Sequence, residues 1–202
     1  MKLHERLPDG VTVNGKTYRL DFDFRNVLRM MEVLGRDDIL PSARDYLALK
    51  CLTKHPKDVG NVLPAVKYLL FGGRKTGSGE RLTSFEQDAG LIRSAFRQEY
   101  GIDLFRDRVH WLEFTELLQN LPEGSRYEEV LGIRSRPIPA PTKYNAKERE
   151  WLLKAKQQCA LHLSEAEAAR KYDADVGRVF SGLIGMIMQK EVKQDGGRTD
   201  CI

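Results

Sequence analysis

The stretch SFEQDAGLIRSAFRQEYG, residues 84–101, carries the clearest helical pattern in the chain. Its apolar side chains recur three or four residues apart, which is the spacing of one face of an amphipathic helix. These positions are Phe85, Ala89, Ile92, Phe96 and Tyr100. Ser84 and Gln87 have the spacing of a capping box, and Gly101 is a common helix-end residue. The pattern predicts a helix over 84–101, and we expect the block 84–134 to build the core.

Further helical patterns lie on both sides of this stretch. The segments predicted to be helical cover residues 24–34, 41–54, 55–72, 106–122 and 125–134. Asp21 or Asp23 can cap the first of them, and Ser125 can cap the last. Pro56 can open the third segment, but Pro64 lies inside it, where proline should kink or split a helix.

The beginning of the chain has a strand pattern instead. Residues 11–20 alternate apolar and polar side chains around Asn14-Gly15, and Asn-Gly favours the positive φ angles of a type I′ turn. Two strands alone are marginally stable in water, so this hairpin should pack against helices or pair with another copy. The fold class predicted is mainly α: a helical bundle with a small N-terminal β-hairpin and a C-terminal helical extension.

A proline-rich segment, SRPIPAPTK, interrupts the helical patterns. Its three prolines favour extended backbone, so we predict a core domain over 1–134, a linker over 135–143 and a C-terminal helical region with a frayed tail over 144–202. That last region carries a helical stripe of apolar residues: Val179, Phe180, Leu183, Ile184, Ile187 and Met188. An amphipathic pattern fits internal packing and docking on a partner equally, so both interpretations stay open.

The glycine-rich stretch LLFGGRKTGSGERLT, residues 69–83, has the composition of a phosphate-binding loop. That motif requires the spacing G-x-x-x-x-G-K-[ST]. Counted back from Lys75, the two positions that require glycine hold Arg74 and Leu69 instead, so no nucleotide site is predicted. We expect a mobile connection between helices, in which Arg74, Lys75 and Arg81 offer a basic contact to an acidic partner.

No other pattern predicts a catalytic, metal or cofactor site. Cys51 with His55 and Cys159 with His162 have the spacing of two metal half-sites, but the pairs lie far apart along the chain. None of the four histidines lies in a nucleophile motif. The net charge of +4, from 33 basic and 29 acidic residues, lacks the surplus of a dedicated nucleic-acid binder. The expected class is a non-enzymatic interaction protein with no cofactor and no nucleic-acid partner.

Cysteine usage and hydropathy bear on location. The three cysteines are an odd number and lie far apart, which favours a reduced, cytoplasmic protein. No window reaches the roughly 18 apolar residues that a membrane span requires. We therefore expect neither a structural disulfide nor a membrane partner.

Residues 84–134 resemble the bacteriophage family named after gene product fifteen. The resemblance rests on an aromatic-acidic helix opening, a Tyr-Gly-Ile-Asp-Leu turn and a His-Trp pair followed three residues later by an aromatic. These residues are Phe85, Glu86, Asp88, Ala89, Ile92, Phe96, Tyr100, Gly101, Ile102, Asp103, Leu104, His110, Trp111 and Phe114. The opening VNGKTYRLDFDFR is also similar, and Leu112 departs from the pattern, which has a second aromatic there. The likeness extends from about residue 7 to 160.

This resemblance implies a tail assembly chaperone of long-tailed phages that coats the tape measure protein and recruits tail tube protein. The expected partners are those two proteins and further copies of the chain, in the host cell cytoplasm, with the protein absent from the mature virion. The alternatives are a structural tail component retained in the virion and a nucleic-acid-binding phage regulator. The candidate partner-binding residues are Trp111, Phe180, Leu183, Ile184, Ile187, Arg74, Lys75 and Arg81. For Trp111 a core position is favoured over an interface.

Overall fold

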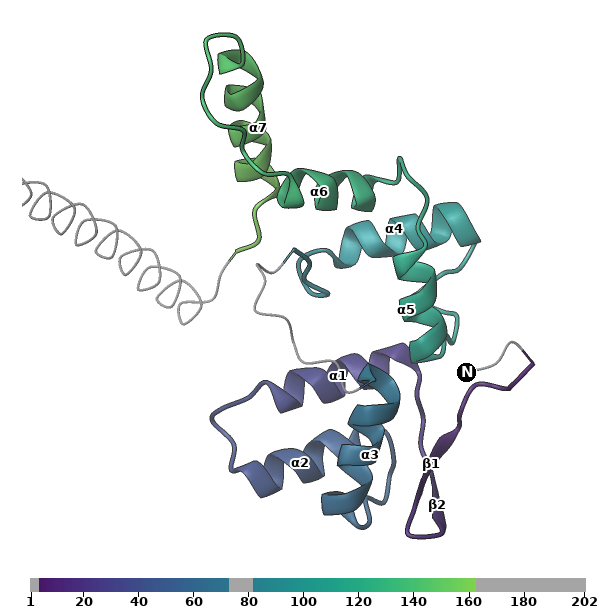
Figure 1. The fold of residues 1–202 in the computed structure, drawn as a ribbon. Coiled ribbons are helices and arrows are strands. Elements are labelled where there is room, and N and C mark those ends of the chain that lie inside the picture. Colours follow the sequence, from purple (N-terminus) through teal and green to yellow (C-terminus); the bar gives the residue numbers. More distant parts are fainter. Residues whose placement is uncertain (1–3, 73–81, 163–202) are drawn as a thin grey trace, which may run out of the picture. The chain divides into compact units, whose positions relative to one another are not determined.

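The computed structural model describes residues 4–72 and 82–162, and Figure 1 shows the order of the elements in them. The elements are β1 (Gly10–Val13), β2 (Lys16–Arg19), α1 (Phe24–Leu34), α2 (Pro41–Lys50), α3 (Val59–Phe71), α4 (Ala89–Tyr100), α5 (Trp111–Gln119), α6 (Arg126–Ser135) and α7 (Ala146–Cys159). All of them belong to one compact unit, Met1–Cys159, and a second unit begins at Ala160. The predicted fold class, mainly α with an N-terminal hairpin and a C-terminal helix, is confirmed.

The N-terminal hairpin forms as its sequence predicts. β1 and β2 pair antiparallel with Val11 opposite Tyr18. Asn14 (φ 51°) and Gly15 (φ 73°) both have the positive φ of a type I′ turn. Val11 is buried, and β1 contacts α3, so the hairpin packs against a helix of its own chain.

Helices α1 to α3 pack together, with α2 contacting both of the others, and α3 also contacts β1 of the hairpin. Asp23 caps α1 as predicted, because its carboxylate accepts a hydrogen bond from the Arg25 amide at 3.0 Å. The prediction that Pro56 opens α3 is wrong: the helix begins at Val59, after Asp58 takes a left-handed φ of 48°. Pro64 lies inside α3 and does not split it, since buried residues on both sides of the proline hold the helix in the core. They are Val62, Leu63, Val66 and Leu70.

The core is centred on aromatic rings from helices distant in sequence. Phe114 of α5 stacks on Phe24 of α1 at 4.8 Å between ring centroids and on Phe96 of α4 at 5.1 Å. Trp111 and Phe85 pack around the same ring. The block 84–134 therefore supplies the centre of the core, and α1 completes it.

Two helices begin later than the sequence predicts. α4 begins at Ala89 rather than Ser84, because residues 85–88 form a turn in which the Asp88 amide donates to the Ser84 carbonyl. α5 spans Trp111–Gln119 rather than 106–122. At the end of α4, Gly101 has a φ of 69°, which is the expected left-handed helix end.

The proline-rich segment folds back along α7, which in turn packs on α6 (Figure 1). Arg149 donates to the Pro139 carbonyl, and the Asn145 amide group donates to the Ala140 carbonyl at 2.9 Å. The segment lies within the unit that ends at Cys159. The predicted division at 135–143 into a core domain and a separate C-terminal region stays a prediction.

Candidate functional site

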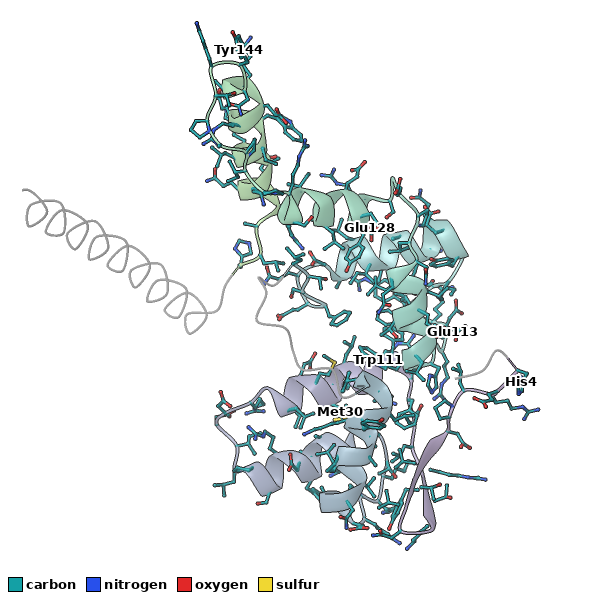
Figure 2. All side chains as sticks on the ribbon, viewed as in Figure 1. His4, Met30, Trp111, Glu113, Glu128 and Tyr144 are labelled. Atoms are coloured by element: carbon teal, nitrogen blue, oxygen red, sulfur yellow. The ribbon has the colours of Figure 1, made fainter. Side chains whose placement is uncertain are left out.

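Of the candidate partner-binding residues, the structure describes Trp111 alone. Phe180, Leu183, Ile184, Ile187, Arg74, Lys75 and Arg81 lie outside the described residues. So does the connection over 73–81 that we expect to be mobile. Trp111 is 3% exposed at the start of α5, where Figure 2 shows it facing the interior. This position fits the core interpretation favoured for it, and a role in partner binding stays a prediction.

Trp111 also has an unusual polar atom. Its indole Nε1 is buried and has no hydrogen-bond partner among the described residues. Phe71 and Phe85 pack edge-on against the ring, each with its centroid 6.0 Å away. The environment is therefore aromatic and apolar, and the indole N–H is left without the acceptor that buried tryptophans usually have.

His110 is a helix cap and does not offer a catalytic base. Its Nδ1 accepts a hydrogen bond from the Leu112 amide at 3.1 Å, which caps α5. Its Nε2 lies 3.0 Å from the Pro8 carbonyl oxygen. Since a carbonyl only accepts, Nε2 carries the proton, and the neutral imidazole has both nitrogens engaged. The sequence prediction placed His110 on a helix but did not predict the cap.

Around His110, the segments before α1 and α5 pair side by side. The Phe24 amide donates to the Val109 carbonyl at 3.0 Å, and the Trp111 amide donates to the Phe22 carbonyl at 2.8 Å. A hollow of about 240 Å³ lies beside these paired segments, and Asp21, Asp23 and Arg108 are among the residues that line it.

Asp21, Asp23 and Arg108 of this hollow are engaged in ion pairs. Arg108 reaches both oxygens of Asp21 at 2.7 and 2.8 Å, and Arg25 pairs with Asp23 at 3.1 Å. The arrangement therefore joins the starts of α1 and α5.

The most buried ion pair among the described residues is a clasp between Asp88 and Arg134. The two side chains make a bidentate ion pair, with both N–O distances 2.8 Å. Asp88 is 2% exposed, and the Arg134 side chain is 11% exposed. Asp88 also accepts from the Ser84 amide at 2.9 Å, where a capping box would use the side chain at position 87. We call this ion pair the Asp88–Arg134 clasp.

Burial and hydrogen bonding oppose each other in the clasp. Burial alone would raise the pKa of Asp88, but hydrogen bonds from Arg134 and from the Ser84 amide outweigh it and hold this pKa below its usual range. The hydrogen bonds to Asp88 raise the pKa of Arg134. Burial raises the pKa of Tyr127, whose hydroxyl lies 3.0 Å from the Thr83 hydroxyl beside the clasp. Both ions of the clasp therefore stay charged at neutral pH.

Arg134 also holds two segments that are distant in sequence. Its Nη1 donates to the Leu82 carbonyl at 2.9 Å, and its Nε donates to the Cys159 carbonyl at 2.6 Å. Leu82 lies near the end of the glycine-rich stretch, and Cys159 is the last residue of the first unit. The guanidinium of Arg134 is therefore fully engaged inside the protein and is not free to contact a partner.

The described residues hold no group of three or more His, Cys, Asp or Glu side chains that could bind a metal ion. The thiol of Cys51 instead donates to the Leu47 carbonyl at 3.4 Å, and burial raises its pKa. In residues 4–72 and 82–162, no helix has the length and apolar content needed to cross a membrane.

Large apolar side chains that are exposed come from several elements. Those that are more than 70% exposed are Leu40, Tyr68, Phe105 and Tyr144. Tyr144 is 93% exposed next to the start of α7 (Figure 2). Single exposed apolar residues are normal on protein surfaces, so each one needs a second observation before it indicates a binding site.

Comparison with known protein families identifies a bacteriophage family. The model of a family described as Bacteriophage Gp15 protein matches residues 3–161, which include every helix and strand described above. It is a family of bacteriophage proteins and is not a known enzyme family. Comparisons with curated proteins and with solved structures gave no significant match.

Proposed function

The chain belongs to the bacteriophage Gp15 family, and from this premise we propose that it is a tail assembly chaperone of a long-tailed phage. The match over residues 3–161 is the observation that carries the proposal. The protein binds the tape measure protein, promotes assembly of tail tube protein around it and performs no chemistry. It acts in the host cell cytoplasm, associates with copies of itself and is absent from the finished virion.

The physical logic of this function is the temporary covering of apolar surface. A tape measure protein is long and helical, and its apolar stripes aggregate when they are left bare. Weak contacts repeated along such a chain give a high overall affinity while each single contact stays easy to release. An aromatic side chain held at the surface of a well-packed body, such as Tyr68, is suited to contacts of this kind.

Co-expression tests the proposal directly. The full chain is produced together with the tape measure protein of the same phage, and the soluble fraction and the co-purified protein are measured. We expect the tape measure protein to become more soluble and to co-purify with the chain. The proposal is wrong if neither its solubility nor its recovery changes relative to expression alone.

Mass spectrometry of purified virions separates a chaperone from a retained structural component. A chaperone is present in the infected-cell lysate and missing from the particle. Detection of the chain in virions at a stoichiometry comparable to that of tail tube protein would assign it to the structural class.

A further inference from the structure

An exposed aromatic ring projects from the loop that joins α4 to α5. Phe105 is 71% exposed, whereas Leu104 next to it is buried in the core. The guanidinium of Arg93 lies over the Phe105 ring, 4.4 Å from its centroid. Arg97 and Arg106 have side chains that are 72% and 86% exposed, and both lie near the Asp103 carboxylate in the same loop. We call Arg93, Arg97, Phe105 and Arg106 the Phe105 patch.

The loop that carries the ring is held firmly in place. The Asp103 carboxylate accepts from the Phe105 amide at 3.0 Å, and the Asp103 amide donates to the Asp107 carboxylate at 2.7 Å. From α1, Arg25 donates to the Leu104 carbonyl at 2.9 Å and to the Asp107 carbonyl at 2.7 Å. Phe105 is therefore presented to solvent by a pre-organised loop, which lowers the entropy cost of binding to it.

The charge of the patch indicates what it can bind. The patch has three arginines, and its loop carries two carboxylates, Asp103 and Asp107. Arg97 and Arg106 lie 3.7 Å and 3.9 Å from the Asp103 carboxylate, whose side chain is 20% exposed. Pairs at such distances on the surface are weak, so the guanidinium groups keep most of their capacity for new partners. The patch consequently combines an apolar ring with an excess of positive charge.

We propose that the Phe105 patch binds an acidic amphipathic helix of a protein partner. An apolar side chain of that helix packs on the open face of Phe105, and its carboxylates pair with Arg97 and Arg106. Aromatic and arginine side chains are the types that dominate binding energy at protein interfaces. The identification of this partner as the tape measure protein rests on the proposed function. The binding chemistry of the patch does not depend on that function.

A nucleic acid fits the same surface less well. Single-stranded nucleic acids stack successive bases on several aromatic rings along a basic groove. Here the patch offers one ring, and the Arg93 guanidinium already lies over that ring. The modest net charge of +4 also lacks the basic surplus typical of nucleic-acid binders.

Two designed peptides test the chemistry of the patch with the full chain. Each has about 20 residues, enough for a helix about 30 Å long, with one leucine face. One carries glutamate on its polar face and its twin carries lysine. Binding of each labelled peptide is measured by fluorescence anisotropy for the wild type, for Phe105→Ala and for the pair Arg97→Glu with Arg106→Glu. Tyr144→Ala is the matched control, because it removes an even more exposed aromatic at the start of α7 (Figure 2).

We expect the wild type to bind the glutamate peptide at least about tenfold more tightly than its lysine twin, which corresponds to one strong contact. Phe105→Ala and the double charge reversal should each lose about that factor, and Tyr144→Ala should bind as the wild type does. Thermal melting by circular dichroism should be unchanged in all variants, because the altered side chains are at the surface. The proposal is overturned if the wild type binds the two peptides equally tightly, or if the patch variants bind the glutamate peptide as tightly as the wild type does.

The same variants distinguish failure of the patch from failure of the proposed function. If the wild type captures the tape measure protein and the patch variants capture it equally well, the patch is not the docking surface and the proposed function stands. If the wild type fails to capture it while the peptide results hold, the proposed function fails and the patch is supported. Binding of a labelled single-stranded oligonucleotide that Phe105→Ala abolishes would assign the patch to nucleic acid and overturn the proposal.

Discussion

At the scale of single residues, the Asp88–Arg134 clasp is the ion pair most deeply buried in the part of the chain that the structure describes. A buried ion pair contributes little net stability relative to an apolar pair, but removal of one partner leaves an uncompensated buried charge. Here that charge is Arg134, which also holds the Leu82 and Cys159 carbonyls. The clasp therefore stabilises the fold by linking segments, and its two ions depend on each other.

We predict that Asp88→Asn lowers the free energy of unfolding by about 3–5 kcal/mol at pH 7, because it strands the buried Arg134 cation. Urea unfolding followed by circular dichroism measures this loss. Asp38→Asn is the matched control, since it removes a carboxylate from an exposed pair with Arg36 and should leave the midpoint unchanged. An equal effect of the two substitutions would contradict the role of the clasp.

The loss of unfolding free energy caused by Asp88→Asn should also depend on pH in a defined direction. The pKa of Asp88 is lowered in the folded state, so the native protein binds fewer protons than the unfolded chain as the pH falls. The stabilisation is complete above the usual aspartate pKa of about 4 and is lost as the pH falls through the lower folded-state value. The difference in unfolding free energy between the wild type and Asp88→Asn should thus become smaller below about pH 4. A difference that stays constant in acid would exclude the ionised clasp as its cause.

The sequence predicted the residues near the clasp but not the clasp itself. Ser84 was identified as a cap, and its hydroxyl does accept from the Gln87 amide at 3.3 Å. The deciding partner, Arg134, is 46 residues from Asp88, and no local spacing rule connects them. Phe105 was missed for a similar reason: its exposure depends on how Arg25 and Asp103 fix the loop, and an isolated phenylalanine in a sequence favours a buried position.

At the scale of secondary-structure elements, helix starts depend on tertiary contacts more than on local signals. α5 begins at Trp111 because residues 103–107 form their own turn, in which the amides of Arg106 and Asp107 donate to the Asp103 carbonyl. Periodicity predicted this helix and its apolar face correctly. Its start could not be predicted, because the His110 cap is fixed by the Pro8 carbonyl, which is 102 residues away.

We predict that His110→Ala costs roughly 1–3 kcal/mol of stability, since it removes the α5 cap and leaves the Pro8 carbonyl without its donor. His110→Asn is the matched variant, because asparagine is also a good N-cap but is too short to replace the imidazole at Pro8. We expect an intermediate loss for asparagine, measured by urea unfolding at neutral pH. If alanine and asparagine cost the same, the cap contributes nothing and the imidazole acts only through Pro8.

At the scale of the whole described unit, packing is distributed unevenly. One continuous apolar core extends from Val11 in the hairpin to Tyr127 at the start of α6. Leu152, the buried residue of α7, lies outside that core. α7 is therefore attached by its packing on α6 and by polar contacts with the end of α6, among them the hydrogen bond from Arg134 to the Cys159 carbonyl and the bond from Lys156 to the Arg134 carbonyl. The proline-rich segment that predicted a domain boundary marks the place where the main core ends.

This distribution predicts that α7 opens at a lower free energy than the core helices. Amide hydrogen exchange on the full chain measures the protection of each helix, because elements with few buried apolar contacts exchange through local opening. Arg134→Lys keeps the charge beside Asp88 but loses the planar fork that reaches several acceptors at once. We expect it to reduce the protection of α7 more than that of α1 and α3, which do not touch the clasp. If α7 exchanges at the same free energy as α4 and α5 in the wild type, the unit opens as a single body and the boundary predicted at 135–143 does not separate two domains.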